Sequence, residues 1–166
     1  VTGHGGAIHV DSALGVGTTF HLWLPSTERA PVAAAPEAPV PPGQGEHVLY
    51  VDDDDVMTLV VEQLLVQAGY RATSVRDAAR ALALVQQEPL AFDAVVTDFD
   101  MPLRNGIDLA LDILASRPGL PVVLASGSMA EALEAAARAV GVRAVLAKER
   151  TVDDLARRLA EVFGRA

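Results

Sequence analysis

Two acidic segments of this chain each follow a short apolar run, and they hold the residues best suited to chemistry. In "YVDDDD" the acids Asp52 and Asp53 end one run, and in "VVTDFDMPLRNG" the acid Asp98 ends another. Three carboxylates brought together would repel one another, and some would take up protons unless a cation joined them. Mg²⁺ prefers oxygen ligands, so a shared location for these acids predicts a magnesium site.

Two further polar residues end apolar runs in the same way. Ser126 follows "VVLA", and Lys148 follows "AVLA" as the only lysine among the 13 basic residues. A compact ammonium group suits a phosphate or a carboxylate as a point charge. A metal, a carboxylate nucleophile, a hydroxyl and a cation are together the parts that phosphoryl transfer needs, because that reaction depends on positioning and charge neutralisation.

Each acidic segment also has a purely structural interpretation. An acid that follows a strand often caps the next helix, and we expect Asp54 or Asp55 to do so before Val56. Taken alone, the four aspartates indicate capping and solvation more often than a site, and Asp98 alone is as often a turn residue. The joint placement of the two segments favours the site.

The elements that would position these residues alternate regularly from residue 47 onward. The apolar patterns predict strands at about 47–51, 71–75, 93–97, 121–125 and 143–147, and helices at about 55–68, 77–87, 106–116, 128–140 and 151–163. Five such units predict a doubly wound α/β fold, with helices on both faces of a five-stranded parallel sheet. In the strand order 2-1-3-4-5, strands one and three are neighbours, so Asp52, Asp53 and Asp98 would share one crevice at the carboxyl edge.

The segment before residue 47 has a different composition. Residues 7–12 and 18–24 are β-prone and are joined by a turn containing Gly15 and Gly17. A lone hairpin is marginal in water, so this part is expected to lack its packing partners. Residues 26–46 are rich in Pro and Ala, which predicts an extended linker. We therefore predict three parts, at residues 1–25, 26–46 and 47–166.

Composition excludes several classes of function. The chain is 51% hydrophobic and 21% charged, so a packed core is expected, and its net charge of -9 argues against nucleic acid as the main partner. It has no cysteine, which excludes disulfides and thiolate metal sites. Nothing in it reads as a membrane span or a signal peptide. The first residue is Val1, so we expect a cytoplasmic piece of a longer protein.

With these motifs in hand, residues 47–164 resemble the receiver domains of two-component response regulators, which have a flavodoxin-like fold. The resemblance implies that Asp98 is the phosphoacceptor and that Mg²⁺ is bound by Asp53 directly, by Asp52 largely through water, by Asp98 and by the backbone carbonyl of Asp100. It implies that Ser126 senses the phosphoryl group and that Lys148 pairs with it. Met101-Pro102 and Gly106 fit the loop that follows the acceptor in this family.

Two positions depart from the pattern of that family. Glu149 follows the lysine where a proline, often after a cis bond, is usual, so we expect a trans bond and a differently shaped loop. Val145 stands where an aromatic ring usually turns inward on activation. A valine side chain has no ring to swing, so the output switch is expected to differ.

Residues 1–25 are similar to the end of a histidine kinase ATP-binding domain, with "GVGT" at residues 15–18 resembling its last glycine box. The rest of that domain is absent, so we expect neither ATP binding nor kinase activity in this chain. The order of parts implies a hybrid histidine kinase as the parent protein. The implied partners are a histidine kinase phosphodonor or a histidine phosphotransfer protein, without nucleic acid or membrane contact. The alanine-rich helix at 128–140 leaves homodimerisation open.

Two other functions compete with the phosphoacceptor hypothesis. Asp98 and Asp100 form a D-x-D pair, as in metal-dependent phosphatases, but the pair follows the third strand rather than the first and no lid-sized insertion is present. A receiver-like binding module that is never phosphorylated is the second alternative, with Val145 and Glu149 as marks of an altered switch.

Overall fold

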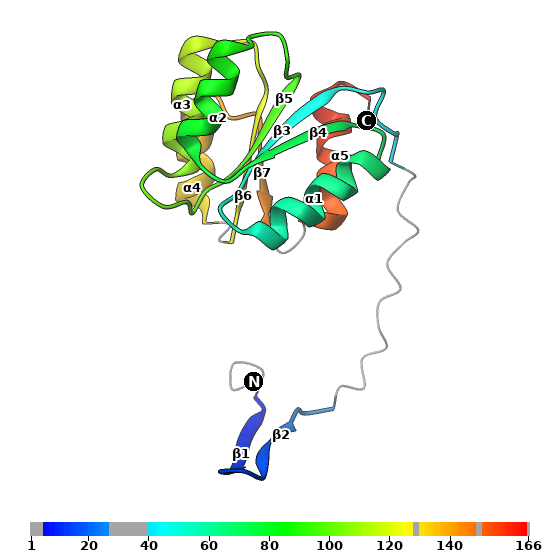
Figure 1. Ribbon diagram of the computed structural model, residues 1–166, viewed down its shortest axis with the longest axis vertical. Coiled ribbons are helices and arrows are strands. Elements are labelled where there is room, and N and C mark those ends of the chain that lie inside the picture. Colours follow the sequence, from blue (N-terminus) through cyan, green and yellow to red (C-terminus); the bar gives the residue numbers. More distant parts are fainter. Residues whose placement is uncertain (1–4, 27–39, 128–129, 149–150, 166) are drawn as a thin grey trace. The chain divides into compact units, whose positions relative to one another are not determined.

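The computed structural model describes residues 5–26, 40–127, 130–148 and 151–165. The contacts within the chain divide it into two units, residues 1–38 and 39–166 (Figure 1). Each unit is described by itself.

The larger unit is built on a parallel sheet of five strands. Its strands are β3 (His47–Val51), β4 (Arg71–Val75), β5 (Ala94–Asp98), β6 (Val122–Ser126) and β7 (Ala144–Ala147). They are ordered β4-β3-β5-β6-β7, which confirms the predicted order 2-1-3-4-5. The predicted positions hold to within one residue, with the last three strands beginning one residue later than expected.

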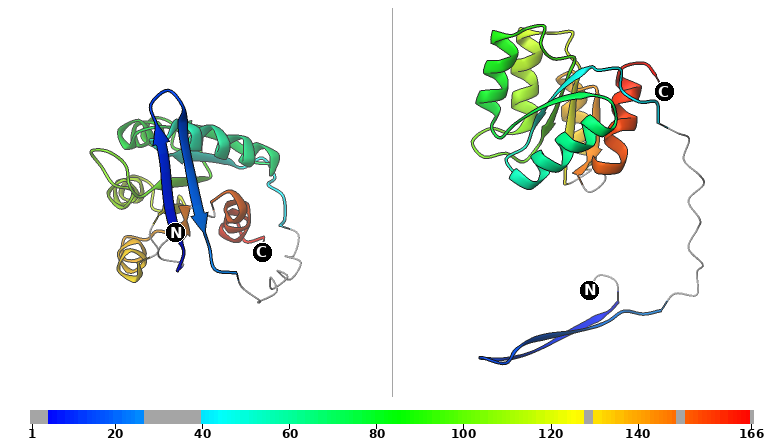
Figure 2. Two further views of the ribbon diagram at one scale, coloured as in Figure 1. Left: turned by 90° about the horizontal axis from the view of Figure 1, so that it is seen from below. Right: turned by 45° about the vertical axis from the view of Figure 1, so that its right-hand side comes forward.

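Five helices cover the two faces of this sheet. They are α1 (Asp55–Gln67), α2 (Ala78–Gln87), α3 (Gly106–Ser116), α4 (Glu131–Ala139) and α5 (Thr151–Val162). Helices α1 and α5 pack on one face, and α2, α3 and α4 pack on the other, as Figures 1 and 2 show. The predicted start of α4 at residue 128 lies outside the described residues. None of the described helices has the length and apolarity required to cross a membrane.

The strands supply both cores because successive side chains point to opposite faces of a sheet. In β3, Val48 and Tyr50 join the core under α1 and α5, whereas Leu49 and Val51 join the core under the other three helices. All five residues of β5 and all five of β6 are buried. This is the pattern of central strands in a sheet that is covered on both sides.

Local capping explains where α1 begins. The side chain of Asp54 accepts hydrogen bonds from the backbone N–H groups of Val56 and Met57, at 2.8 and 3.1 Å. These bonds satisfy two of the free N–H groups at the helix start. They lower the pKa of Asp54 below its usual value. Of the two capping acids predicted, Asp54 therefore has this role, and it leaves Asp52 and Asp53 for the sheet edge.

The smaller unit is an antiparallel hairpin of β1 (Ala7–Ala13) and β2 (Gly17–Trp23). Every residue of both strands is exposed. Its turn occupies residues 14–16, with Gly15 at φ 76°. Gly17 was expected in the turn but is the first residue of β2, at φ 127°, a value that favours glycine.

Candidate functional site

The acids of the two motifs meet at the carboxyl edge of the sheet. Strands β3 and β5 are hydrogen-bonded neighbours, so the residues that end them lie side by side. One carboxylate oxygen from each of Asp52, Asp53 and Asp98 lies within 4.8 Å of the other two. Asp52 and Asp98 are buried, with exposed fractions of 0% and 1%, whereas Asp53 is exposed. The structure thus brings together the three carboxylates that the sequence singled out.

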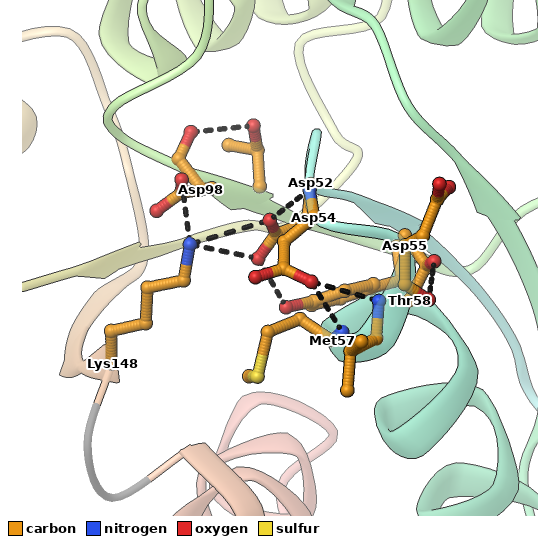
Figure 3. A network of polar contacts seen from close by, with 10 residues as sticks. Asp52, Asp54, Asp55, Met57, Thr58, Asp98 and Lys148 are labelled. Atoms are coloured by element: carbon orange, nitrogen blue, oxygen red, sulfur yellow. Dashed lines mark hydrogen bonds and ion pairs between the residues drawn. The ribbon is translucent and has the colours of Figure 1, made fainter. Parts of the chain in front are cut away.

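Lys148 bridges the two buried acids from the end of β7. Its Nζ donates to Oδ2 of Asp98 at 2.9 Å and lies 3.1 Å from Oδ2 of Asp52 (Figure 3). Burial by itself lowers the pKa of Lys148, but the hydrogen bonds to Asp98 and Asp52 outweigh it and raise the pKa above its usual value. The side chain is therefore a permanent cation at the centre of the cluster.

Asp52 is held by further donors. The Tyr50 hydroxyl donates to Oδ2 of Asp52 at 2.8 Å, and the backbone N–H of Asp54 donates to Oδ1 at 3.0 Å. Burial, followed by the charge of Asp52, raises the pKa of Tyr50 well above its usual value, so the phenol remains a donor. Tyr50 was not predicted as part of the site. Its position two residues before Asp52 was the available signal, because residues two apart in extended backbone share a face.

Asp98 differs from Asp52 in having one oxygen without a partner. Its Oδ2 accepts from Lys148, but its Oδ1 is buried and has no hydrogen bond among the described residues. Burial raises the pKa of Asp98 above its usual value, the charge of Asp52 adds to this, and Lys148 opposes it. A buried acceptor without a donor costs free energy, and a cation or a proton at this oxygen would offset that cost.

The cluster fits a hard divalent cation. Its donors are carboxylate oxygens, it includes the exposed Asp53 through which an ion can enter, and it contains the unpartnered Oδ1 of Asp98. Mg²⁺ is bound in proteins by one or two carboxylates with several waters retained. Within the described parts of the chain, no second cluster of three His, Cys, Asp or Glu residues has this geometry.

The other predicted residues lie along the same edge. Ser126 ends β6 and is buried, with its neighbour Ala147 opposite in β7. Asp100 is exposed in the loop after β5, where Met101 is buried and anchors the loop. A side chain at Gly106 would collide with the backbone oxygen of Asp98, so glycine lets the loop close against the strand.

Of the two positions that depart from the family pattern, the structure describes only Val145. Val145 lies in β7, partly buried against the core. The expected trans bond between Lys148 and Glu149 lies outside the described residues.

A doubly wound parallel sheet with three acids, a serine and a lysine at its carboxyl edge defines a class of phosphoryl-accepting signalling domains. The response regulator receiver domain family matches residues 48–160. The chain therefore belongs to that family. Receiver domains are the phosphoacceptor modules of two-component systems, and the family assigns this role to the domain.

Two relatives match nearly the whole chain. The virulence sensor protein BvgS of Bordetella bronchiseptica is 37% identical over 98% of this chain, and the sensor histidine kinase AruS of Pseudomonas aeruginosa is 31% identical over 95%. The matches span only 14% and 16% of those two proteins. Among solved structures, the chemotaxis protein CheY4 of Vibrio cholerae is 25% identical with a TM-score of 0.66, covering 71% of this chain and 98% of its own.

Proposed function

We propose that Asp98 accepts a phosphoryl group from a phosphohistidine while Mg²⁺ is held by the carboxylates of Asp52, Asp53 and Asp98 and by the backbone carbonyl of Asp100. The observation that carries the proposal is the buried Oδ1 of Asp98, which has no hydrogen bond among the described residues and belongs to a carboxylate that Lys148 holds by its other oxygen. A rigidly held carboxylate with one available oxygen is suited to act as a nucleophile.

In the proposed reaction an oxygen of Asp98 forms a bond to phosphorus as the bond between phosphorus and the histidine nitrogen breaks. The imidazole leaves with the electron pair of the broken bond, and the product is an acyl phosphate. When bound, Mg²⁺ neutralises charge on the phosphoryl oxygens. Lys148, which already contacts Asp98 at 2.9 Å, pairs with one phosphoryl oxygen. The hydroxyl of Ser126, at the end of the adjacent strand β6, donates to another.

The wider assignment concerns the three parts of the chain. We propose that residues 1–25 end a kinase ATP-binding domain, that residues 26–46 form the linker and that residues 47–166 form the receiver. The matches to BvgS and AruS support this, because they cover 98% and 95% of the chain and so extend beyond the receiver. The parent would be a cytoplasmic or membrane-anchored hybrid histidine kinase. Its receiver would exchange phosphoryl groups with a histidine kinase or a histidine phosphotransfer protein.

The test is to treat the purified chain with acetyl phosphate in the presence and absence of Mg²⁺ and to measure its intact mass. We expect one phosphoryl adduct that forms only with Mg²⁺, that hydroxylamine removes and that maps to Asp98. Asp98→Asn should form none. Asp100→Asn is the matched control, because it keeps the backbone carbonyl at that position and should keep the adduct.

Two further measurements on the same proteins distinguish the phosphoacceptor from a phosphatase and from a binding module. A phosphatase that uses Asp98 and Asp100 would hydrolyse p-nitrophenyl phosphate over many turnovers and would lose that activity in Asp100→Asn. A binding module would give no adduct although circular dichroism shows a folded chain. Either result would overturn the proposal.

A further inference from the structure

The opposite, amino edge of the sheet carries a set of contacts that the phosphoacceptor chemistry does not use. Residues 42–46, called the anchor here, precede β3 and hydrogen-bond to the turn at residues 68–71, which joins α1 to the first residue of β4. Gly43 N–H donates to the Ala68 carbonyl at 2.7 Å, and Gly45 N–H donates to the Gly69 carbonyl at 3.0 Å. The N–H of Arg71 donates to the carbonyl at the other end of the anchor, that of Glu46, at 2.9 Å.

Arg165, close to the C-terminus, holds the anchor from the other side. Its Nη1 donates to the Pro42 carbonyl at 2.7 Å, and its Nη2 lies 2.9 Å from Oε1 of Glu46. The guanidinium also lies over the rings of Tyr70 and Phe163, 5.7 and 5.5 Å from their centroids. With 16% of its side chain exposed, Arg165 is well shielded from solvent. Planar stacking combined with forked donation is geometry that a guanidinium provides and an ammonium does not.

The anchor also fits too closely to be an incidental contact. A Cβ at Gly43 would lie 2.7 Å from the carbonyl of Gly69, and a Cβ at Gly69 would lie 2.7 Å from the backbone oxygen of Gly43. Two glycines therefore let two backbone segments touch. We call the anchor, the turn at 68–71 and Arg165 together the clasp.

The clasp lies at the far ends of the two helices whose near ends adjoin the acidic cluster. Helix α1 is capped by Asp54 beside Asp52 and ends at the turn that binds the anchor. Helix α5 begins three residues after Lys148 and ends just before Phe163 and Arg165. The two helices share one core, in which Val61, Leu65, Leu155 and Leu159 are buried. Figure 1 shows them together on one face of the sheet.

Phosphorylation of Asp98 would rearrange contacts at the ends of α1 and α5 that adjoin the acidic cluster. Lys148 now bonds to both Asp98 and Asp52, at 2.9 and 3.1 Å. A phosphoryl group on Asp98 would compete for the same ammonium and would weaken its bond to Asp52, and Lys148 lies three residues before the start of α5. Packed helices transmit shifts as small rigid-body sliding movements.

We propose that the clasp couples the state of Asp98 to the linker: a phosphoryl group at Asp98 displaces α5 and loosens the hold of Arg165 on residues 42–46. This inference rests on the proposed function of Asp98. The direction follows from the geometry, since the bonds from Arg165 to Pro42 and Glu46 are already at favourable lengths of 2.7 and 2.9 Å. Any displacement of Arg165 relative to residues 42–46 therefore weakens these two bonds. The linker, which joins the receiver to the preceding unit, would receive the signal.

The experiment uses the whole chain with Mg²⁺ and beryllofluoride, a stable mimic of the phosphoryl group. Binding is followed by ¹⁹F NMR, and amide exchange by ¹⁵N NMR. We expect the amides of Gly43 and Gly45 to exchange at least about threefold faster in the bound state, while those of Val95 and Val96 in β5 do not change. Unchanged exchange at Gly43 and Gly45 with beryllofluoride bound would overturn the coupling alone. Absence of binding would overturn the proposed function and the coupling with it.

A second experiment uses the reciprocity between beryllofluoride binding and the clasp. If the bound state weakens the clasp, then removing the clasp must strengthen binding by the same factor. Arg165→Ala should therefore bind beryllofluoride at least about threefold more tightly. The matched control is Arg158→Ala, which removes an arginine of α5 that is paired with Glu161 on the same helix, and it should bind as the original chain does. Arg165→Lys keeps the charge but not the forked donors of the guanidinium. Its affinity for beryllofluoride should lie between those of Arg165→Ala and the original chain. Original affinity in both Arg165 variants would overturn the proposal.

Discussion

The two edges of the sheet differ in how their charged groups are paired. At the carboxyl edge, Asp52 and Asp98 are buried side by side with one ammonium between them, and Oδ1 of Asp98 has no donor among the described residues. At the amino edge, Arg165 and Glu46 form an ion pair, and the anchor is hydrogen-bonded to the turn after α1. The amino edge also has one buried atom without a hydrogen bond among the described residues, Nε of Arg165. The edges differ in charge: the carboxyl edge buries two like charges next to each other, which lowers stability, whereas the amino edge pairs opposite charges.

The comparison predicts that substitutions at the two edges change stability in opposite directions. Removing charge at the carboxyl edge should stabilise the receiver, whereas disturbing the close contacts at the amino edge should destabilise it.

Gly69→Ala should be the most damaging change. Gly69 has φ 90°, which disfavours any side chain, and its new Cβ would lie 2.7 Å from the backbone oxygen of Gly43. Left-handed strain and the loss of the anchor together should lower the free energy of unfolding by about 3 kcal/mol. Urea denaturation measures this.

Gly119→Ala is the matched control for that change. Nothing lies within 4 Å of the Cβ position at Gly119, and its φ is outside the left-handed region. This variant should be as stable as the original chain or more stable by about 0.5 kcal/mol, because alanine restricts the unfolded state. Equal effects of the two substitutions would mean that the close approach at Gly69 contributes nothing.

Asp98→Asn should have the opposite sign and a smaller size. It removes a buried charge next to Asp52 while keeping an oxygen that Lys148 can bind, so the free energy of unfolding should rise by about 1–2 kcal/mol in the absence of Mg²⁺. Asp53→Asn, at an exposed position, should change stability by less than about 0.5 kcal/mol. A destabilised Asp98→Asn would show that the pair with Lys148 outweighs the cost of burial.

The difference between the edges also explains what the sequence could predict. The acidic cluster was predictable because Asp52 directly follows the apolar strand β3 and Asp98 ends the apolar strand β5, and strand order alone brings such residues together. The clasp was not, because its contacts join residues 123 positions apart, as for Pro42 and Arg165. Residues 42–46 lie in a segment whose composition predicts a linker, and composition does not reveal that two glycines allow backbones to touch. Tyr50 was overlooked because a core tyrosine in a strand needs no functional explanation.

The smallest effect concerns pH and isolates Asp98. Its pKa in the folded chain is raised above the usual 3.8, chiefly by burial, so the folded state binds this proton more tightly than the unfolded state does. The resulting stability is complete below about pH 4 and is lost as pH rises through the folded pKa. Lys148 and Tyr50, whose pKa values are raised from already high ones, do not titrate in this range. Between pH 4 and 8, the original chain should therefore lose more stability than Asp98→Asn. Thermal unfolding in matched buffers measures the difference.

Mg²⁺ should reduce this difference in stability, because a bound cation favours the ionised carboxylate. Parallel pH curves for the two proteins would mean that Asp98 has the same proton affinity folded and unfolded, and that the carboxyl edge stores no repulsion.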